Sequence, residues 1–260
     1  MSLSITPPMC PQCFAALPED APQGLCPSCL MALATLATDQ ETLPLIAADF
    51  PSLTEITSAF PDLEIVEKIG QGGMGVVFKA RQPRLDRMVA LKVLPKRLAA
   101  TLGFPERFRR EGRVLARLNH PSIVTVYDFG ECGGFCYLLM EYVDGDTLLP
   151  WCHRRGPRMP LEKLLDLMAC CARGLDYSHA NGVLHRDIKP SNIMITCSGV
   201  PKIMDFSIAE ISDRKASETV TAVGSPLYMS PEQVSRLPLA PTSDLYALGA
   251  VMYQLPTGET

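Results

Sequence analysis

The chain of 260 residues lacks three features that would each define a class of protein. It has no run of about 18 consecutive apolar residues, so we expect no helix that crosses a membrane. Residues 1–13 have neither a basic start nor an apolar stretch, which argues against a secretory signal there and favours a cytoplasmic protein. Positive charge is not in excess: 24 basic and 28 acidic residues give a net charge of −4, so we expect no nucleic-acid partner.

The composition also excludes a disordered chain. Hydrophobic residues make up 47% of the sequence and charged residues 20%, as in globular proteins. At about 150 residues per domain, the length predicts one to two domains and enough material for one sizeable hydrophobic core.

Cysteine is abundant, with ten residues, and four of them form two C-x2-C pairs separated by twelve residues. These four are Cys10, Cys13, Cys26 and Cys29. A turn over each pair aims two sulfurs at one point, and two such turns complete a tetrahedral thiolate site for zinc. The alternatives are a redox pair or four unligated thiols, but no βαβ pattern of a redox site surrounds either pair. We therefore predict a zinc ribbon over residues 1–30, with a structural zinc because four thiolates leave no open position for chemistry.

The residues around this ribbon suggest its role and its boundary. Residues 10–29 contain no Lys or Arg, so we expect protein recognition or self-association and not nucleic-acid contact. Residues 31–62 favour a linker with a possible short helix, because Ser52 and Glu55 have the spacing of a capping box. We expect the other six cysteines, from Cys132 onward, to be ordinary buried thiols.

A glycine-rich segment begins the region that carries the chemistry. Residues 63–69 alternate as in a strand and lead into Gly70, Gly72 and Gly75. Apolar residues 76–78 follow, so we expect a second strand and not the helix that follows a dinucleotide-binding loop. Glycines let a backbone approach phosphate oxygens, where a Cβ would collide. By itself the segment fits either a phosphate-binding loop or an ordinary glycine-rich hairpin.

Two charged residues then occupy positions where a charge needs a partner. Lys92 ends the β-rich run 89–92, and Glu111 lies four positions before Leu115 on the apolar face of a helical segment. A carboxylate on that side requires a positive partner, and Lys92 is the candidate. The arginines of the same segment fit a solvated helix face or, alternatively, a docking surface; they are Arg107, Arg109, Arg110, Arg113 and Arg117.

The segment after residue 160 is the most specific indication of the reaction that we expect this protein to catalyse. A long helical period over residues 161–178 precedes His-Arg-Asp at 185–187, which Lys189 and Asn192 follow closely. Asp-Phe occurs at 205–206 after a short apolar run.

This ordered set resembles the protein kinase family. Seven motifs match in order and spacing between residues 63 and 260, which is far more specific than any one of them. They are the glycine-rich loop 70–77, Lys92, Glu111, the catalytic loop 185–192, the Asp-Phe pair 205–206, the activation-segment end 224–232 and the helix start 244–249. The resemblance implies an α+β, bilobal protein-kinase-like fold over residues 63–260, with a β-rich N-lobe and a helical C-lobe, preceded by the zinc ribbon.

The resemblance further implies transfer of the γ-phosphate of ATP to Ser or Thr hydroxyls of proteins, with ATP and Mg²⁺ as cofactors. Asp187 would accept the proton of the attacking hydroxyl, and Lys189, typical of serine/threonine kinases, would steady the transferred phosphate. Asn192 and Asp205 would hold Mg²⁺. The implied ATP-binding residues are Ile69, Gly70, Gly72, Gly75, Val77, Lys92, Glu111, Glu141 and Val143. Among these, Glu111 would orient Lys92 toward the α- and β-phosphates.

Regulation by phosphorylation is implied as well. Arg186, beside the catalytic aspartate, is a cation that would pair with a phosphorylated activation segment. The candidates for autophosphorylation are Thr221, then Thr219, then Ser225. For each of them, the alternative is an exposed loop hydroxyl without a function.

The match to the family fails in two places. Ser207 replaces the glycine of Asp-Phe-Gly, which leaves Asp205 intact but puts the backbone freedom of the motif in doubt. The chain also stops soon after the helix that begins near Asp244, so we expect a truncated C-lobe, an unpaired buried Glu232 and an uncovered apolar helix face. We therefore expect a poorly stable or inactive chain. An ATP-binding scaffold or pseudokinase without phosphotransfer is the alternative to the enzyme.

Overall fold

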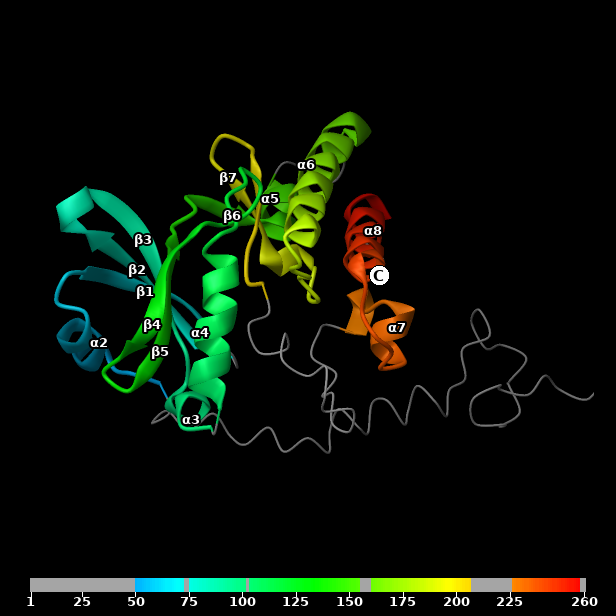
Figure 1. Cartoon of the computed structure of the whole chain (residues 1–260). Coiled ribbons are helices and arrows are strands. Elements are labelled where there is room, and N and C mark those ends of the chain that lie inside the picture. The colour runs from blue at the N-terminus through cyan, green and yellow to red at the C-terminus, as the bar shows by residue number, and fades with distance from the viewer. Residues whose placement is uncertain (1–49, 73–74, 102, 155–159, 207–225, 258–260) are drawn as a thin grey trace, which may run out of the picture. The chain divides into compact units, whose positions relative to one another are not determined.

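The computed structural model describes residues 50–72, 75–101, 103–154, 160–206 and 226–257 (Figure 1). The chain divides after residue 47, and every described residue belongs to the compact unit Ala48–Thr260. The predicted zinc ligands Cys10, Cys13, Cys26 and Cys29 lie outside the described residues, as do Ser207, Thr219, Thr221 and Ser225.

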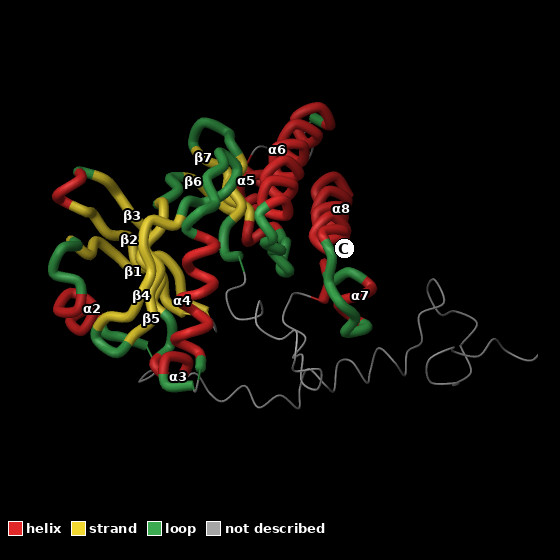
Figure 2. Tube along the Cα trace, in the orientation of Figure 1, coloured by secondary structure: helices red, strands yellow, loops and turns green. Residues whose placement is uncertain are grey.

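The N-lobe is a five-stranded antiparallel sheet with the strand order β1-β2-β3-β5-β4 (Figure 2). Its strands are β1 Glu64–Gly72, β2 Gly75–Gln82, β3 Arg87–Val93, β4 Val126–Cys132 and β5 Phe135–Glu141. Its helices are α2 Leu53–Ala59, α3 Lys96–Ala99 and α4 Phe104–Leu115, with a 3-10 turn η3 at Pro83–Leu85. β1 and β2 form a hairpin in which Gly72 pairs with Gly75, so the glycine-rich segment joins two strands, as predicted.

Alternation along β2 and β3 gives the sheet two apolar faces. Phe78 and Leu91 belong to a buried cluster that includes Ile56 of α2. Their neighbours in sequence, Val77 and Ala90, belong to a second cluster that includes Phe108 of α4. Because successive strand residues point to opposite faces, α2 and α4 cover opposite faces of the sheet (Figure 1).

Helix α4 has the amphipathic character that the sequence predicts. Glu111 lies on its buried side with 1% exposure. Gly112 lies so close to the ring of Phe129 that a Cβ would collide with it, so the helix backbone packs directly on β4. The arginines follow the solvated-face expectation: Arg109, Arg110, Arg113 and Arg117 are exposed and Arg107 is half-buried.

The C-lobe combines a three-stranded sheet, in the order β6-β7-β8, with helices. Its elements are β6 Gly145–Thr147, α5 Leu148–Arg154, α6 Leu161–Ala180, η4 Pro190–Asn192, β7 Ile193–Thr196, β8 Pro201–Ile203, η5 Pro226–Tyr228, α7 Pro231–Val234 and α8 Pro241–Thr257. Leu175 of α6, Ile193 and Ile195 of β7 and Val251 of α8 are fully buried in one cluster. This core holds α6 and α8 together with the strands that flank the catalytic loop.

Strand β8 connects the two lobes. Ile203 donates its amide to Ser122 O (2.8 Å) and accepts from Val124 N (2.9 Å), in the segment that leads into β4. Lys202 Nζ lies 2.7 Å from Glu141 Oε1 and 2.8 Å from Oε2, at the end of β5. Backbone bonds and an ion pair therefore join the lobes near the hinge, which is residues 142–144 between β5 and β6.

None of the helices in the described part of the chain is long and apolar enough to cross a membrane.

The expectation of six buried thiols is only partly right. Cys136, Cys152 and Cys171 are buried, whereas Cys132 and Cys170 are half-buried and Cys197 is exposed. Cys197 lies in the turn between β7 and β8, where loop residues face solvent.

We expect a thiol reagent such as DTNB to modify Cys197 first among these six cysteines, and Cys136 and Cys171 last. Burial raises the pKa of Cys136 to about 11 and that of Cys171 to about 12, so neither thiol forms the reactive thiolate near neutral pH. Time-resolved labelling read by peptide mass spectrometry checks this order. Equal labelling rates for Cys171 and Cys197 in the folded protein would contradict it.

The pair between Glu141 and Lys202 should stabilise the fold measurably. Because the two side chains are only 24% and 15% exposed, loss of either partner leaves a poorly hydrated lone charge. We expect Lys202→Met and Glu141→Gln each to lower the free energy of unfolding by about 1–3 kcal/mol, and the double variant to lose less than the sum. Urea unfolding measures this. As a control, Arg84→Met in the exposed pair with Asp62 should cost under about 1 kcal/mol; strictly additive losses at Glu141 and Lys202 would refute the coupling.

Candidate active site

A buried carboxylate at the start of α8 holds the loop that contains the predicted catalytic residues. Asp244 is 1% exposed and accepts hydrogen bonds from His185 N (2.8 Å), Arg186 N (2.7 Å) and His179 Nε2 (2.8 Å). Burial alone would raise the pKa of Asp244, but these hydrogen bonds lower it below its ordinary value. The carboxylate is therefore charged, and it holds Arg186 at φ 67°, a conformation that costs a non-glycine residue about 1–3 kcal/mol.

His185 is a structural residue of this loop. Its ring is fully buried, and burial lowers its pKa, so the imidazole is neutral. Nε2 lies 2.8 Å from the carbonyl of Met204, while Nδ1 accepts from Asp187 N at 3.2 Å, which assigns the ring proton to Nε2. The ring also packs on Phe206 with centroids 4.6 Å apart. His185 thus joins the catalytic loop to the Asp-Phe segment.

The structure brings Asp187, Lys189 and Asn192 together. Lys189 Nζ lies 2.8 Å from Asp187 Oδ2, and Asn192 Nδ2 donates to the same oxygen at 3.1 Å and to Asp187 O at 2.8 Å. Met204 N donates to Asn192 O at 2.9 Å, so the residue before Asp205 is tied to this group. The carboxylate of Asp187 is held in one orientation by a cation and an amide.

The partner of Lys92 differs from the expectation. Its Nζ lies 2.7 Å from Asp205 Oδ1, and the two side chains are 13% and 29% exposed. Among the described residues the ion pair of Lys92 is with Asp205 and not with Glu111, so the predicted Lys92 to Glu111 pair is wrong for this conformation. A half-buried ammonium group needs a carboxylate, but sequence spacing does not decide between two that the fold brings within reach.

The glycine-rich hairpin lies beside Lys92 in the sheet. Val77, two residues after Gly75, pairs with Lys92 across β2 and β3. Gly75 has φ +142°, and a Cβ there would lie 2.6 Å from Val93 O, so only glycine allows this close approach. Ile69, Gly70 and Gly72 all lie on β1, where the side chain of Ile69 is 46% exposed.

An apolar cluster next to Lys92 draws on both lobes. It includes Val77, Ala90, Met140 and Val143 from the N-lobe and hinge, and Met194 and Met204 from the C-lobe. A cavity of about 40 Å³ adjoins it, and its lining includes Lys92, Met140, Asp205 and Phe206. A larger hollow of about 380 Å³ lies between α6 and the turn before β8, but its lining includes none of the predicted catalytic residues. The candidate site is therefore located by the residues that line the smaller cavity and not by the size of the cavity.

The expectation for Glu232 is wrong. Glu232 is half-buried and accepts a hydrogen bond from Ser243 Oγ at 2.5 Å, and its hydrogen bonds lower its pKa. The hydroxyl of Ser243 satisfies this carboxylate in place of a charged partner. The predicted uncovered helix face is present on α8, where Leu245 and Tyr246 are 48% and 51% exposed.

Sequence reasoning missed several residues that position the site. His179 contacts Asp244 across 65 positions, and Lys202 contacts Glu141 across 61. A histidine near a helix end and a lysine in a short strand carry no local signal of a partner so far away. Asp244, an acidic residue in the first turn of an apolar helix, was the one local sign in the sequence that a partner was needed there.

Known proteins share these features. Residues 63–260 match the protein kinase domain family. Serine/threonine-protein kinase PknB of Mycobacterium leprae is 46% identical over 202 residues, and PknB of Mycobacterium tuberculosis H37Rv is 44% identical over 203. Each alignment covers 75% of this chain and 32% of the relative, so the chain spans about a third of the length of these relatives.

A solved structure agrees with the sequence match. The crystal structure of the M. tuberculosis PknI kinase domain has a TM-score of 0.62 to this chain and is 34% identical, covering 76% of this chain and 73% of that one. The sheet of the N-lobe and the helices of the C-lobe are thus those of a protein kinase. The chain belongs to the protein kinase domain family.

Proposed function

We propose that this chain carries an ATP-dependent serine/threonine protein kinase activity. The observation that carries the proposal is the convergence of Lys189 and Asn192 on one carboxylate oxygen of Asp187, where Asn192 also contacts the residue before Asp205. Its PknB relatives, which are named as serine/threonine-protein kinases, support it. Cytoplasmic location belongs to the proposal because ATP, the predicted phosphoryl donor, is a cytoplasmic metabolite.

The residues present fit ATP and magnesium. Asp205 and Asn192 offer carboxylate and amide oxygens, the hard ligands that Mg²⁺ prefers. Lys92 supplies a positive charge beside an apolar cluster suited to an adenine ring, and Gly75 has no Cβ where the hairpin backbone approaches its neighbour. When bound, magnesium would neutralise phosphate charge, which is the main requirement of phosphoryl transfer.

The chain's own residues then have distinct tasks. Asp187, 12% exposed and oriented by Asn192, would accept the proton of a substrate Ser or Thr hydroxyl. Lys189, 2.8 Å from that carboxylate, would steady the transferred phosphate. Arg186, whose backbone Asp244 holds, would pair with a phosphate on Thr221, Thr219 or Ser225.

Asp187→Asn should reduce phosphate transfer about 100-fold or more, because the amide cannot accept the hydroxyl proton. Transfer from γ-labelled ATP to a generic Ser/Thr substrate measures this, and phosphopeptide mapping of the same samples tests Thr221, Thr219 and Ser225. Asp166→Asn, at an exposed position of α6, is the matched control and should leave the rate unchanged. Equal activity of the wild type and Asp187→Asn would favour an ATP-binding scaffold.

A structural zinc on Cys10, Cys13, Cys26 and Cys29 is a further part of the proposal, supported by their spacing. We expect one equivalent of zinc per chain by elemental analysis, and its loss in Cys10→Ser combined with Cys26→Ser. Cys197→Ser, at the exposed cysteine of the C-lobe, should keep the full equivalent. Self-association through this segment would show as a zinc-dependent increase in mass by light scattering. If Cys10→Ser combined with Cys26→Ser left the zinc content as high as in Cys197→Ser, the proposed zinc site would be wrong.

A further inference from the structure

Helix α2 lies outside the residues that match the kinase family, yet it is built into the N-lobe. The family match begins at residue 63, whereas α2 spans Leu53–Ala59. Ser52 and Glu55 form the predicted capping box: Ser52 N donates to Glu55 Oε2 at 2.8 Å and Glu55 N donates to Ser52 Oγ at 3.2 Å. A helix this short is stable only when capped and packed against other elements.

The apolar side of α2 packs on the face of the sheet opposite to α4. Ile56 is 0% exposed and Phe60, just after the helix, is 9% exposed; both join Phe78 of β2 and Leu91 of β3 in one cluster. The ring of Phe60 meets that of Tyr137 edge-on, with centroids 5.0 Å apart. These contacts reach three strands, including the strand that carries Lys92.

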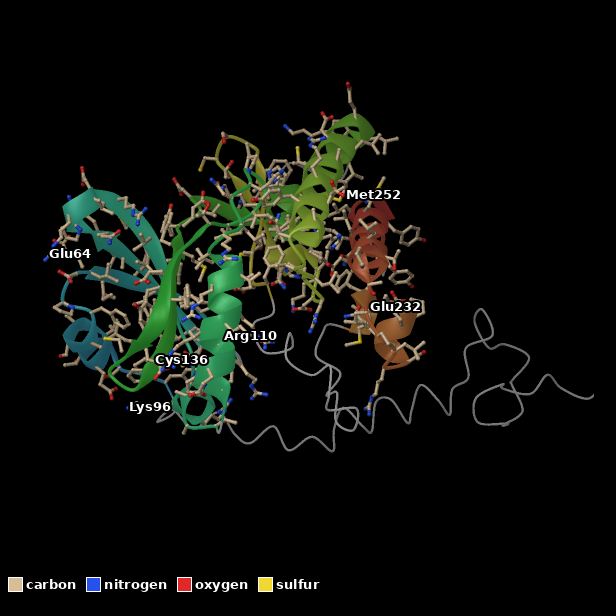
Figure 3. All side chains as sticks on the ribbon, in the orientation of Figure 1. Glu64, Lys96, Arg110, Cys136, Glu232 and Met252 are labelled. Carbon is tan, nitrogen blue, oxygen red and sulfur yellow. The ribbon has the colours of Figure 1, made fainter. Side chains whose placement is uncertain are left out.

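Polar contacts fix both ends of α2. At its end, Cys132 Sγ donates to Ala59 O at 2.9 Å from the β4–β5 hairpin. Near its start, α2 meets Lys96 of α3, which is labelled in Figure 3. Lys96 Nζ lies 3.1 Å from Glu55 Oε1 and 4.7 Å from the centroid of the Phe135 ring. α3 begins four residues after Lys92 and leads to α4, which carries Glu111.

We propose that α2 is a positioning element for the ATP site, which holds β3 from the outer face of the sheet and holds the β3–α4 connection through Lys96. The inference rests on the proposed kinase function. Lys92 projects from the opposite face of β3 to Leu91 and Val93, which lie in the cluster with α2. Removal of that cover frees the strand to shift, and with it the ammonium group of Lys92.

The carboxylate of Glu55, which pairs with Lys96, is charged throughout the neutral range. A backbone hydrogen bond from Ser52, together with Lys96, lowers the pKa of Glu55 to about 2. The carboxylate's contribution is therefore present above its ordinary pKa and is lost only as pH falls toward 2. The effects described below should not change between pH 6 and pH 9.

Ile56→Asp tests the packing of α2 in the full chain, with Leu53→Asp as the matched control. Ile56 is fully buried, whereas Leu53 on the same helix is 56% exposed, so the same charge is introduced on opposite sides. We expect Ile56→Asp to raise the Kd of a fluorescent ATP analogue and the KM for ATP at least about fivefold, and Leu53→Asp to change neither by more than about twofold. A folded Ile56→Asp protein with wild-type nucleotide affinity would overturn the proposal.

Should Ile56→Asp fail to fold, milder changes at the ion pair decide the question. Lys96→Met keeps the aliphatic stem and Glu55→Gln keeps the cap, and each should raise the Kd of the ATP analogue about twofold to fivefold. Lys96→Arg should restore wild-type affinity, and the Glu55→Gln and Lys96→Met double variant should be no worse than the weaker single. A lower melting temperature with unchanged Kd and KM in all of these variants would mean that α2 only stabilises the fold, which overturns the proposal.

The binding assay separates this inference from the proposed function. If the wild type binds the ATP analogue without transferring phosphate, the kinase activity fails while the order of Kd values still decides the role of α2. If the wild type binds no nucleotide, both proposals fall.

Discussion

The carboxylate of Asp244 is the contact on which the catalytic loop depends. It accepts hydrogen bonds from two consecutive amides of that loop and from His179 near the end of α6, so one buried charge joins α6, α8 and residues 185–186. Hydrogen bonds to a charged group away from water are strong, which is why the loop can keep Arg186 at a positive φ. The next residue, Asp187, is then held beside Lys189 and Asn192.

Buried charge also joins the two lobes, because each half-buried lysine at their contact forms an ion pair with the carboxylate that the fold brings close. Lys92 pairs with Asp205 across 113 positions, and Lys202 pairs with Glu141 across 61. The first pair joins β3 to the Asp-Phe segment, and the second joins β8 to the hinge. Since a charge in a poorly hydrated site is costly alone, these pairs restrict the ways in which the N-lobe and the C-lobe can fit together. Lys96 and Glu55 extend the same arrangement to α2, although that pair is more exposed.

Much of the fold could be predicted from local pattern, and the same patterns indicate which residues belong to the candidate site. The hairpin at Gly72 and Gly75, the amphipathic helix with Glu111 and the capping box at Ser52 each express a periodicity or spacing of a few residues. The family match and the solved structure confirm the bilobal kinase fold. Its prediction was specific because seven such motifs had to occur in one order. Two errors concern partners: Lys92 pairs with Asp205 and not with Glu111, and Glu232 accepts from Ser243 in place of an arginine. A third error concerns burial, because Cys197 lies in an exposed turn.

The sequence by itself determined which residue types the site contains, since a carboxylate, a lysine or a glycine at a given spacing is a local property. Only the tertiary structure decided which of these groups touch, because contacts such as Asp244 with His185 or Ile56 with the sheet depend on chain segments that are distant in sequence. The choice of partner depends on the distances that packing leaves between side chains. No short stretch of the sequence contains those distances, so the sequence could propose candidate site residues but not which of them pair.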